Sequence, residues 1–171
     1  MNSRSLAAPL ASLLLAALSP LAPAQTSPRQ PTALQQARVL VARETAQVRL
    51  LERTGLLHPL RVSRRCADRL GRVRLTVLAD VRNTPRIVRY RRALPGNNVQ
   101  FTGYYDATGR LRYATARASG SSGVRYNLAA EYDVRGRLLR ETGIRRPGYV
   151  TELRRQPGLH VESLRRGLCP G

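Results

Sequence analysis

The chain has 171 residues, with 30 basic residues against 10 acidic ones and a formal net charge of +20 at pH 7. This length suits one domain with a single hydrophobic core rather than several domains. The positive charge attracts polymers of phosphate, sulfate or carboxylate at low salt. Every basic residue is arginine. A GC-rich genome produces the same bias, so charge alone does not establish a binding function.

The first 24 residues have the pattern of a secretory signal peptide. Arg4 supplies the positive n-region, residues 6–18 form an apolar run, and Ala22-Pro23-Ala24 is a small-x-small cleavage site. The apolar run is too short for a membrane anchor and contains proline. We therefore expect a secreted or periplasmic protein whose mature chain starts at Gln25 and has no stable membrane span.

A flexible linker is expected over residues 25–31, which are polar and contain proline. A helix is expected over residues 33–54, because Thr32 and Gln35 form a capping-box pattern and Gly55 is a stop signal. The apolar residues at helical spacing are Leu34, Ala37, Val41, Val48 and Leu51. We expect this stripe to pack on one face of a sheet, the alternative being a helix that binds a partner or a membrane surface.

Two short segments of the chain repeat each other at an interval of 27 residues. Residues 105–112 read YDATGRLR, and residues 132–139 read YDVRGRLL. The aspartate of each segment can close an Asx turn, and the glycine supplies the positive φ of a type I turn with a bulge. The turn-forming residues are Asp106, Gly109, Asp133 and Gly136. A fainter copy begins at Asp80, with Asn83 in place of the glycine, so we expect repeated β-hairpins.

Apolar and polar residues alternate on both sides of these turns, as they do in strands with one buried face. One example is the run from Val124 to Tyr132. Further turn signals stand at residues 96–98 and 120–123. The sequence therefore predicts an antiparallel meander of six to seven strands between Arg72 and Leu153. With the helix, this gives an α+β fold in a single domain over residues 32–171.

The chain has two cysteines, Cys66 and Cys169. In an oxidising compartment an even number of cysteines favours one disulfide, which would tie the C-terminus to the segment before the first long strand. The alternative is a catalytic thiol. Cys169 is followed only by Pro170 and Gly171, which is a poor position for a nucleophile.

Few residues could support catalysis or metal binding. The histidines, His58 and His160, could form an acid–base pair at a phosphate, but their spacing does not require it. The sequence has no metal-ligand spacing, no Gly-x-Gly-x-x-Gly and no P-loop. Asp106 and Asp133 lack the clustered carboxylates of a calcium loop. We expect a non-enzymatic protein without cofactor or metal, with a small hydrolase or nuclease as the least favoured alternative.

Arginines alternate with apolar residues along the expected strands. The candidate anion-binding residues are Arg89, Arg91, Arg110, Arg112 and Arg125. If the apolar residues face the helix, these arginines line the opposite, open face of the sheet, where they can clamp phosphates or carboxylates. The alternative is a solvated face that prevents edge pairing.

The leading interpretation is an envelope or secreted protein that binds an anionic polymer or an acidic protein. The polymer could be nucleic acid, acidic glycan or cell-surface material. A protein–protein interaction module of the inhibitor or immunity type is the second interpretation.

The motif Tyr-Asp-x-x-Gly-Arg-Leu at residues 105–111 and 132–138 resembles the core of the YD repeat of Rhs-type and teneurin-like secreted proteins. This resemblance implies β-hairpins in a protein outside the cytoplasm. The interval between the copies is longer than the usual YD period, and the chain is too short for an Rhs shell. No activity and no catalytic residue carries over from the resemblance.

Overall fold

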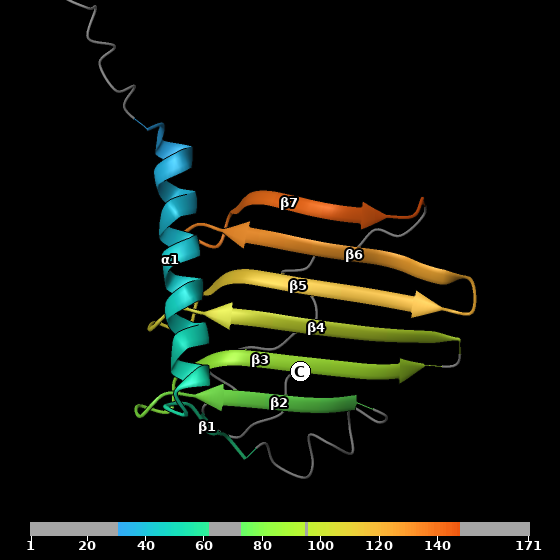
Figure 1. Cartoon of the computed structure of the whole chain (residues 1–171), viewed down its shortest axis with the longest axis horizontal. Coiled ribbons are helices and arrows are strands. Elements are labelled where there is room, and N and C mark those ends of the chain that lie inside the picture. Colours follow the sequence, from blue (N-terminus) through green and yellow to red (C-terminus); the bar gives the residue numbers. More distant parts are fainter. Residues whose placement is uncertain (1–30, 62–72, 95, 148–171) are drawn as a thin grey trace, which may run out of the picture. The chain divides into compact units, whose positions relative to one another are not determined.

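The computed structural model describes residues 31–61, 73–94 and 96–147. Within these ranges the elements are α1 (Ala33–Arg53), β1 (His58–Pro59), β2 (Val73–Ala79), β3 (Pro85–Leu94), β4 (Asn97–Tyr105), β5 (Leu111–Gly120), β6 (Gly123–Tyr132) and β7 (Leu138–Arg145). The seven strands form one antiparallel sheet in the order β1 to β7, each paired with the next (Figure 1). The predicted α+β class and the meander are confirmed.

The turn at Asp106 has the predicted geometry. The Gly109 N–H donates to the Asp106 carbonyl at 3.0 Å, and Gly109 has a φ of +79°. The Asp106 carboxylate accepts from the backbone N–H groups of Thr108 at 2.8 Å and Arg110 at 3.0 Å. One side chain thus holds both ends of the turn, which explains why an aspartate opens each copy of the repeat.

The same turn recurs at Asp133 and at Asp80. Gly136 has a φ of +74°, and Asn83 has a φ of +57° at the equivalent position. The Asn83 N–H donates to the Asp80 carbonyl at 2.8 Å. Asparagine tolerates this left-handed conformation better than most residues, so the faint third copy of the repeat is a real hairpin.

The Asp133 carboxyl makes this turn sensitive to acid. The Arg137 N–H, above all, holds the pKa of Asp133 below its usual value, and the Arg137 side chain and the Arg135 N–H add to this against the opposing effect of burial. A lowered folded-state pKa gives stability that is present above the unfolded pKa of about 4 and is lost as pH falls through the folded pKa. We expect Asp133→Asn, which keeps an acceptor oxygen but cannot titrate, to have a flatter stability profile in acid. Urea midpoints measured into the acid range test this, and parallel profiles for the two proteins would contradict it.

Each of the three turns is followed by a β-bulge in the second strand of its hairpin. Tyr104 pairs with Tyr113 and Tyr105 pairs with Leu111, so Arg112 has no opposite residue. The residues skipped in this way are Arg86, Arg112 and Leu139. A bulge re-aims a side chain that strict alternation would send to the other face, and this positions Arg112 as described below.

The ends of α1 are formed by the predicted caps. Thr32 and Gln35 form both hydrogen bonds of a capping box. At the C-terminus, Gly55 has a φ of +70°, and the N–H of Leu56 donates to the Leu51 carbonyl at 2.9 Å, as in a Schellman motif. The predicted boundaries of 33–54 are therefore correct to one residue.

The predicted apolar stripe of α1 is only partly correct. The buried residues are Val41, Thr45 and Val48, whereas Leu34 is 52% exposed. Among the described residues, no helix has the length and hydropathy needed to cross a membrane. The buried strip of α1 is thus short, and hydrophobic burial alone does not explain how the helix packs.

The two faces of the sheet differ in character, and α1 packs on the polar one. The buried apolar face includes Val77, Val88, Phe101, Ala114, Ala116, Ala118, Tyr126, Leu128 and Ala130. The helix instead contacts Tyr104, Tyr113 and Glu131, which are cross-strand neighbours on the opposite face. The helix packs on one face of the sheet, as expected. The condition under which the candidate arginines would line the open face, that the apolar residues of the strands face the helix, is not met, because the sheet-facing side of α1 also carries charged residues whose partners lie on the polar face.

Three ion pairs join α1 to this polar face. Their nitrogen–oxygen distances are 2.7 Å for Arg38–Glu131, 2.9 Å for Glu44–Arg112 and 2.6 Å for Glu52–Arg89. Figure 1 shows that the helix crosses one end of the sheet, beside the turns that follow β2, β4 and β6. The other half of the polar face is not covered by α1.

Several predicted features lie outside the described residues. These are the signal peptide over residues 1–24, the linker up to Gln30, His160, and the cysteines Cys66 and Cys169. The disulfide between the two cysteines therefore stays a prediction.

Candidate anion-binding face

The half of the polar face that α1 leaves open carries two rows of cross-strand neighbours. The first, here called the arginine row, consists of Arg74, Arg91, Gln100, Arg117 and Asn127. The second, here called the threonine row, lies one step nearer to α1 and consists of Thr76, Arg89, Thr102, Thr115 and Ala129. The two rows contain no acidic residue, so their charge is entirely positive.

Three arginines of the arginine row have no hydrogen-bond or ion-pair partner among the described residues. They are Arg74, Arg91 and Arg117, and all three are exposed. Neighbouring strands are about 4.8 Å apart. Arg74 on β2 is therefore next to Arg91 on β3, while Arg117 on β5 lies two strands, or about 10 Å, from Arg91. Guanidinium groups in this arrangement can bind several anionic groups along one ligand.

A shallow depression of about 270 Å³ joins the two rows. Its polar lining consists of Arg74, Thr76, Arg89, Arg91, Gln100 and Thr102. Tyr90 and Phe101 also line it, but both belong to the apolar cluster of the opposite face. The cationic groups therefore stand next to hydroxyl and amide groups that can donate and accept hydrogen bonds.

The five arginines predicted from the sequence do not share one surface. Arg91 belongs to the arginine row, and Arg89 lies beside it but is paired with Glu52. Arg110 lies after the Asp106 turn, at the end of the sheet that α1 crosses, where its Nη1 donates to the Val134 carbonyl at 2.7 Å. Arg125 donates to the Gly96 carbonyl at 3.2 Å near the opposite turns. The structure thus brings only Arg89 and Arg91 together.

Arg112 was expected to bind anions, and this expectation is wrong. Its side chain is 1% exposed beneath α1. Its Nε lies 2.9 Å from Glu44 Oε2, and its Nη1 lies 3.7 Å from Asp106 Oδ2, although neither nitrogen has good hydrogen-bond geometry to a described acceptor. The bulge at this residue turns the guanidinium under the helix instead of onto the open face.

Two arginines of the arginine row were missed in the sequence. Arg74 stands before Leu75 on β2, and Arg117 stands between Ala116 and Ala118 on β5. The signal was present, because counting outward from the Asp80 turn and allowing one bulge residue places Arg74 opposite Arg91. Strict alternation without the bulge gives the wrong partner.

His58 does not form an acid–base pair in the described part of the chain. It is exposed on β1, and its Nε2 lies 3.0 Å from the Asn83 side-chain oxygen, which belongs to a turn. Within residues 31–61, 73–94 and 96–147, no group of three or more potential metal ligands was found.

Comparison with known proteins gives no relative. No family model matches the chain, and neither the curated proteins nor the solved structures include a match. The resemblance to YD repeats therefore stays a prediction.

Proposed function

We propose that this protein is a non-enzymatic, exported protein that binds an anionic polymer on the open half of its polar sheet face. The observation that supports this most directly is the arginine row, in which Arg74, Arg91 and Arg117 have no acidic partner in the described structure. Elsewhere in the described chain, acidic residues neutralise arginines that hold the fold together, such as Arg86 and Arg112. Arg74, Arg91 and Arg117 form no ion pair of this kind among the described residues.

The side chains of the two rows favour an acidic polysaccharide over single-stranded nucleic acid. Neither row contains an aromatic side chain, and proteins that bind single strands generally stack bases on such groups. Thr76, Thr102 and Gln100 instead offer hydroxyl and amide groups beside the arginines. This combination suits a chain that carries both acidic groups and hydroxyl groups.

Export and the Cys66–Cys169 disulfide are part of this proposal. They are supported by the signal-peptide pattern and by the even number of cysteines in the sequence. Labelling of free thiols in the exported protein, before and after reduction, is the measurement that tests the disulfide.

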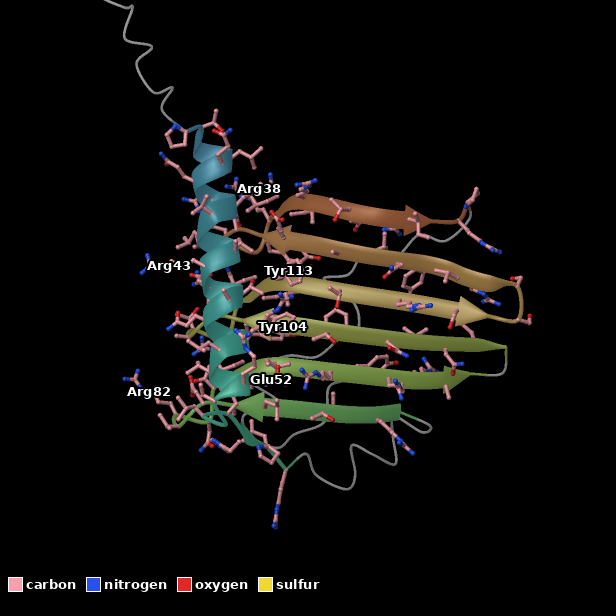
Figure 2. The ribbon with its side chains drawn as sticks, viewed as in Figure 1. Arg38, Arg43, Glu52, Arg82, Tyr104 and Tyr113 are labelled. Carbon is pink, nitrogen blue, oxygen red and sulfur yellow. The ribbon has the colours of Figure 1, made fainter. Side chains whose placement is uncertain are left out.

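The test of the binding proposal is a charge-matched pair of triple variants. We expect Arg74→Gln/Arg91→Gln/Arg117→Gln to weaken heparin binding by about tenfold or more and to reduce the slope of log affinity against log salt by about 2, since each contact contributes roughly 0.7. The control, Arg43→Gln/Arg82→Gln/Arg135→Gln, removes the same charge from exposed residues outside the two rows. Figure 2 shows Arg43 and Arg82 on the side of α1 away from the open half.

Binding of heparin and of single-stranded DNA by the full chain is measured over a salt series for all three proteins. Equal losses in the two triple variants would mean that only net charge matters, and would overturn the assignment of the arginine row. Tighter binding of DNA than of heparin at equal salt would overturn the preference for a polysaccharide.

A further inference from the structure

A second concave site lies between α1 and the polar face, beside the open half. It has a volume of about 590 Å³, which is in the usual range for small-molecule sites. Its walls include Val41, Ala42 and Ala46 of α1, together with Tyr104 of β4 and Tyr113 of β5. The two tyrosine rings are tilted by 45° with their centroids 5.9 Å apart (Figure 2). The groove is thus lined by apolar and aromatic surface on both sides.

The charges that line this groove do not cancel. Its two acidic residues, Glu52 and Glu131, are each bound by an arginine outside the lining, Arg89 at 2.6 Å and Arg38 at 2.7 Å. Arg49 and Arg53 also line the groove, and neither side chain has a hydrogen-bond or ion-pair partner in the described part of the chain. The net unpaired charge in the groove is therefore positive, which suits an anionic ligand.

Arg49 is held in a suitable orientation for binding a carboxylate. Its guanidinium carbon lies 5.0 Å from the centre of the Tyr104 ring and 5.7 Å from that of Tyr113. Such cation–π contacts restrain the guanidinium while its N–H groups remain available as donors. A carboxylate can then accept two parallel hydrogen bonds from one arginine.

The groove also contains a buried polar group without a partner. Thr45 is 7% exposed, and its hydroxyl has no hydrogen bond to a described group. A hydroxyl buried in this way destabilises the protein unless something bonds to it. The hydroxyl oxygen has almost no exposed surface, so a polar group on a bound molecule can complete this hydrogen bond once the Thr45 side chain turns toward the groove that it lines.

We propose that this groove binds a small ring-bearing carboxylic acid. The ring lies against the tyrosines and the apolar side of α1, the carboxylate binds Arg49, and a polar ring substituent reaches Thr45. This site does not depend on the arginine row, because Arg74, Arg91 and Arg117 are not among its lining residues.

The test is calorimetric titration of the full chain with 4-hydroxyphenylacetate, its neutral amide, and acetate. We expect the acid to bind at least about tenfold more tightly than either comparison compound, because the amide lacks the carboxylate contact and acetate lacks the ring contact. Arg49→Gln should weaken binding of the acid by about tenfold or more. Arg43→Gln, an exposed change on the same helix, should leave it unchanged.

Thermal unfolding of Arg49→Gln shows whether α1 still packs, and Thr45→Val provides a second variant that keeps the arginine. We expect Thr45→Val to lose the preference for the hydroxylated acid over phenylacetate. Absence of saturable binding in the millimolar range, or equal affinity in wild type and a folded Arg49→Gln variant, would overturn the site. Loss of acid binding in the Arg74/Arg91/Arg117 variant would also overturn it, because the acid would then bind on the open face and not in the groove. Retained acid binding in that variant would support the groove as the binding site, whether or not the variant loses heparin binding.

Discussion

Replacing Arg112 by alanine is expected to lower the free energy of unfolding by about 3–5 kcal/mol, the usual effect of removing one partner of a buried ion pair. The side chain is 1% exposed and lies between Glu44 on α1 and Asp106 in the turn before β5. Its loss leaves both carboxylates without their guanidinium and opens a void between the helix and the sheet. The variant should therefore loosen α1 as well as the hairpin.

Removal of Glu44 should cost less than removal of Arg112. Burial raises the pKa of Glu44, and the nearby Arg112 charge lowers it by less than burial raises it. A raised folded-state pKa means that the ionised carboxylate is less stable in the protein than in water, so stability falls as pH rises through the unfolded and then the folded pKa. Glu44→Gln removes that unfavourable ionisation and still presents an oxygen to Arg112. The buried Arg112 guanidinium loses the negative charge of Glu44, however, so we expect the free energy of unfolding to fall by about 1 kcal/mol.

The measurement is urea denaturation of wild type, Arg112→Ala, Glu44→Gln and Arg117→Ala. Arg117 is the matched control, because it is an exposed arginine on the same strand without a partner among the described residues. Its replacement should change stability by no more than about 0.5 kcal/mol. A similar, small loss for Arg112→Ala would show that the guanidinium is not held under α1.

The hairpins and the helix caps were predictable because their determinants are local. An aspartate followed by glycine three residues later contains all the groups that close the turn at Asp106, and Thr32 with Gln35 contains those that begin α1. The repetition of one turn at a regular interval then fixed the order of the strands. No contact distant in sequence was needed for either inference.

The face on which the helix packs was not predictable, because it depends on contacts between distant residues. Leu34, which belongs to the predicted stripe, is exposed, while Arg38 and Glu52 point to the sheet and pair with Glu131 and Arg89. Hydrophobic periodicity weights the leucines and ignores the ion pairs. It therefore gave no reason to place the helix on the polar face.

The candidate site was only partly predictable for a related reason. Arg89 and Arg91 were identified by their alternation with apolar residues, but alternation cannot show where α1 crosses the sheet and covers it. It also fails at a bulge, which is why Arg112 was placed on the wrong surface. Arg74 and Arg117 are 43 positions apart in the sequence numbering, and they enter one row only through the register of β2 to β5.

The second large effect is expected at Gly143, in the middle of β7. Its φ is +122°, a backbone conformation that L-residues rarely adopt. A Cβ atom there would stand 2.0 Å from the Asn127 carbonyl oxygen of β6. Both the strain and the clash must be relieved by moving β7. Each costs about 1–3 kcal/mol, so Gly143→Ala should destabilise the protein by about 3 kcal/mol or more.

Gly55→Ala separates the two contributions to this effect. Gly55 also has a positive φ, +70°, but a Cβ atom there would meet nothing within 4 Å. Its replacement should cost only the strain of a left-handed residue, about 1–2 kcal/mol. Amide exchange in Gly143→Ala should increase mainly along β6 and β7, because β7 ends the described sheet and can detach while β2 to β5 stay paired. Equal losses in the two variants would mean that β7 shifts freely. In that case Gly143 would be needed for its backbone conformation and not for the close approach of the two strands.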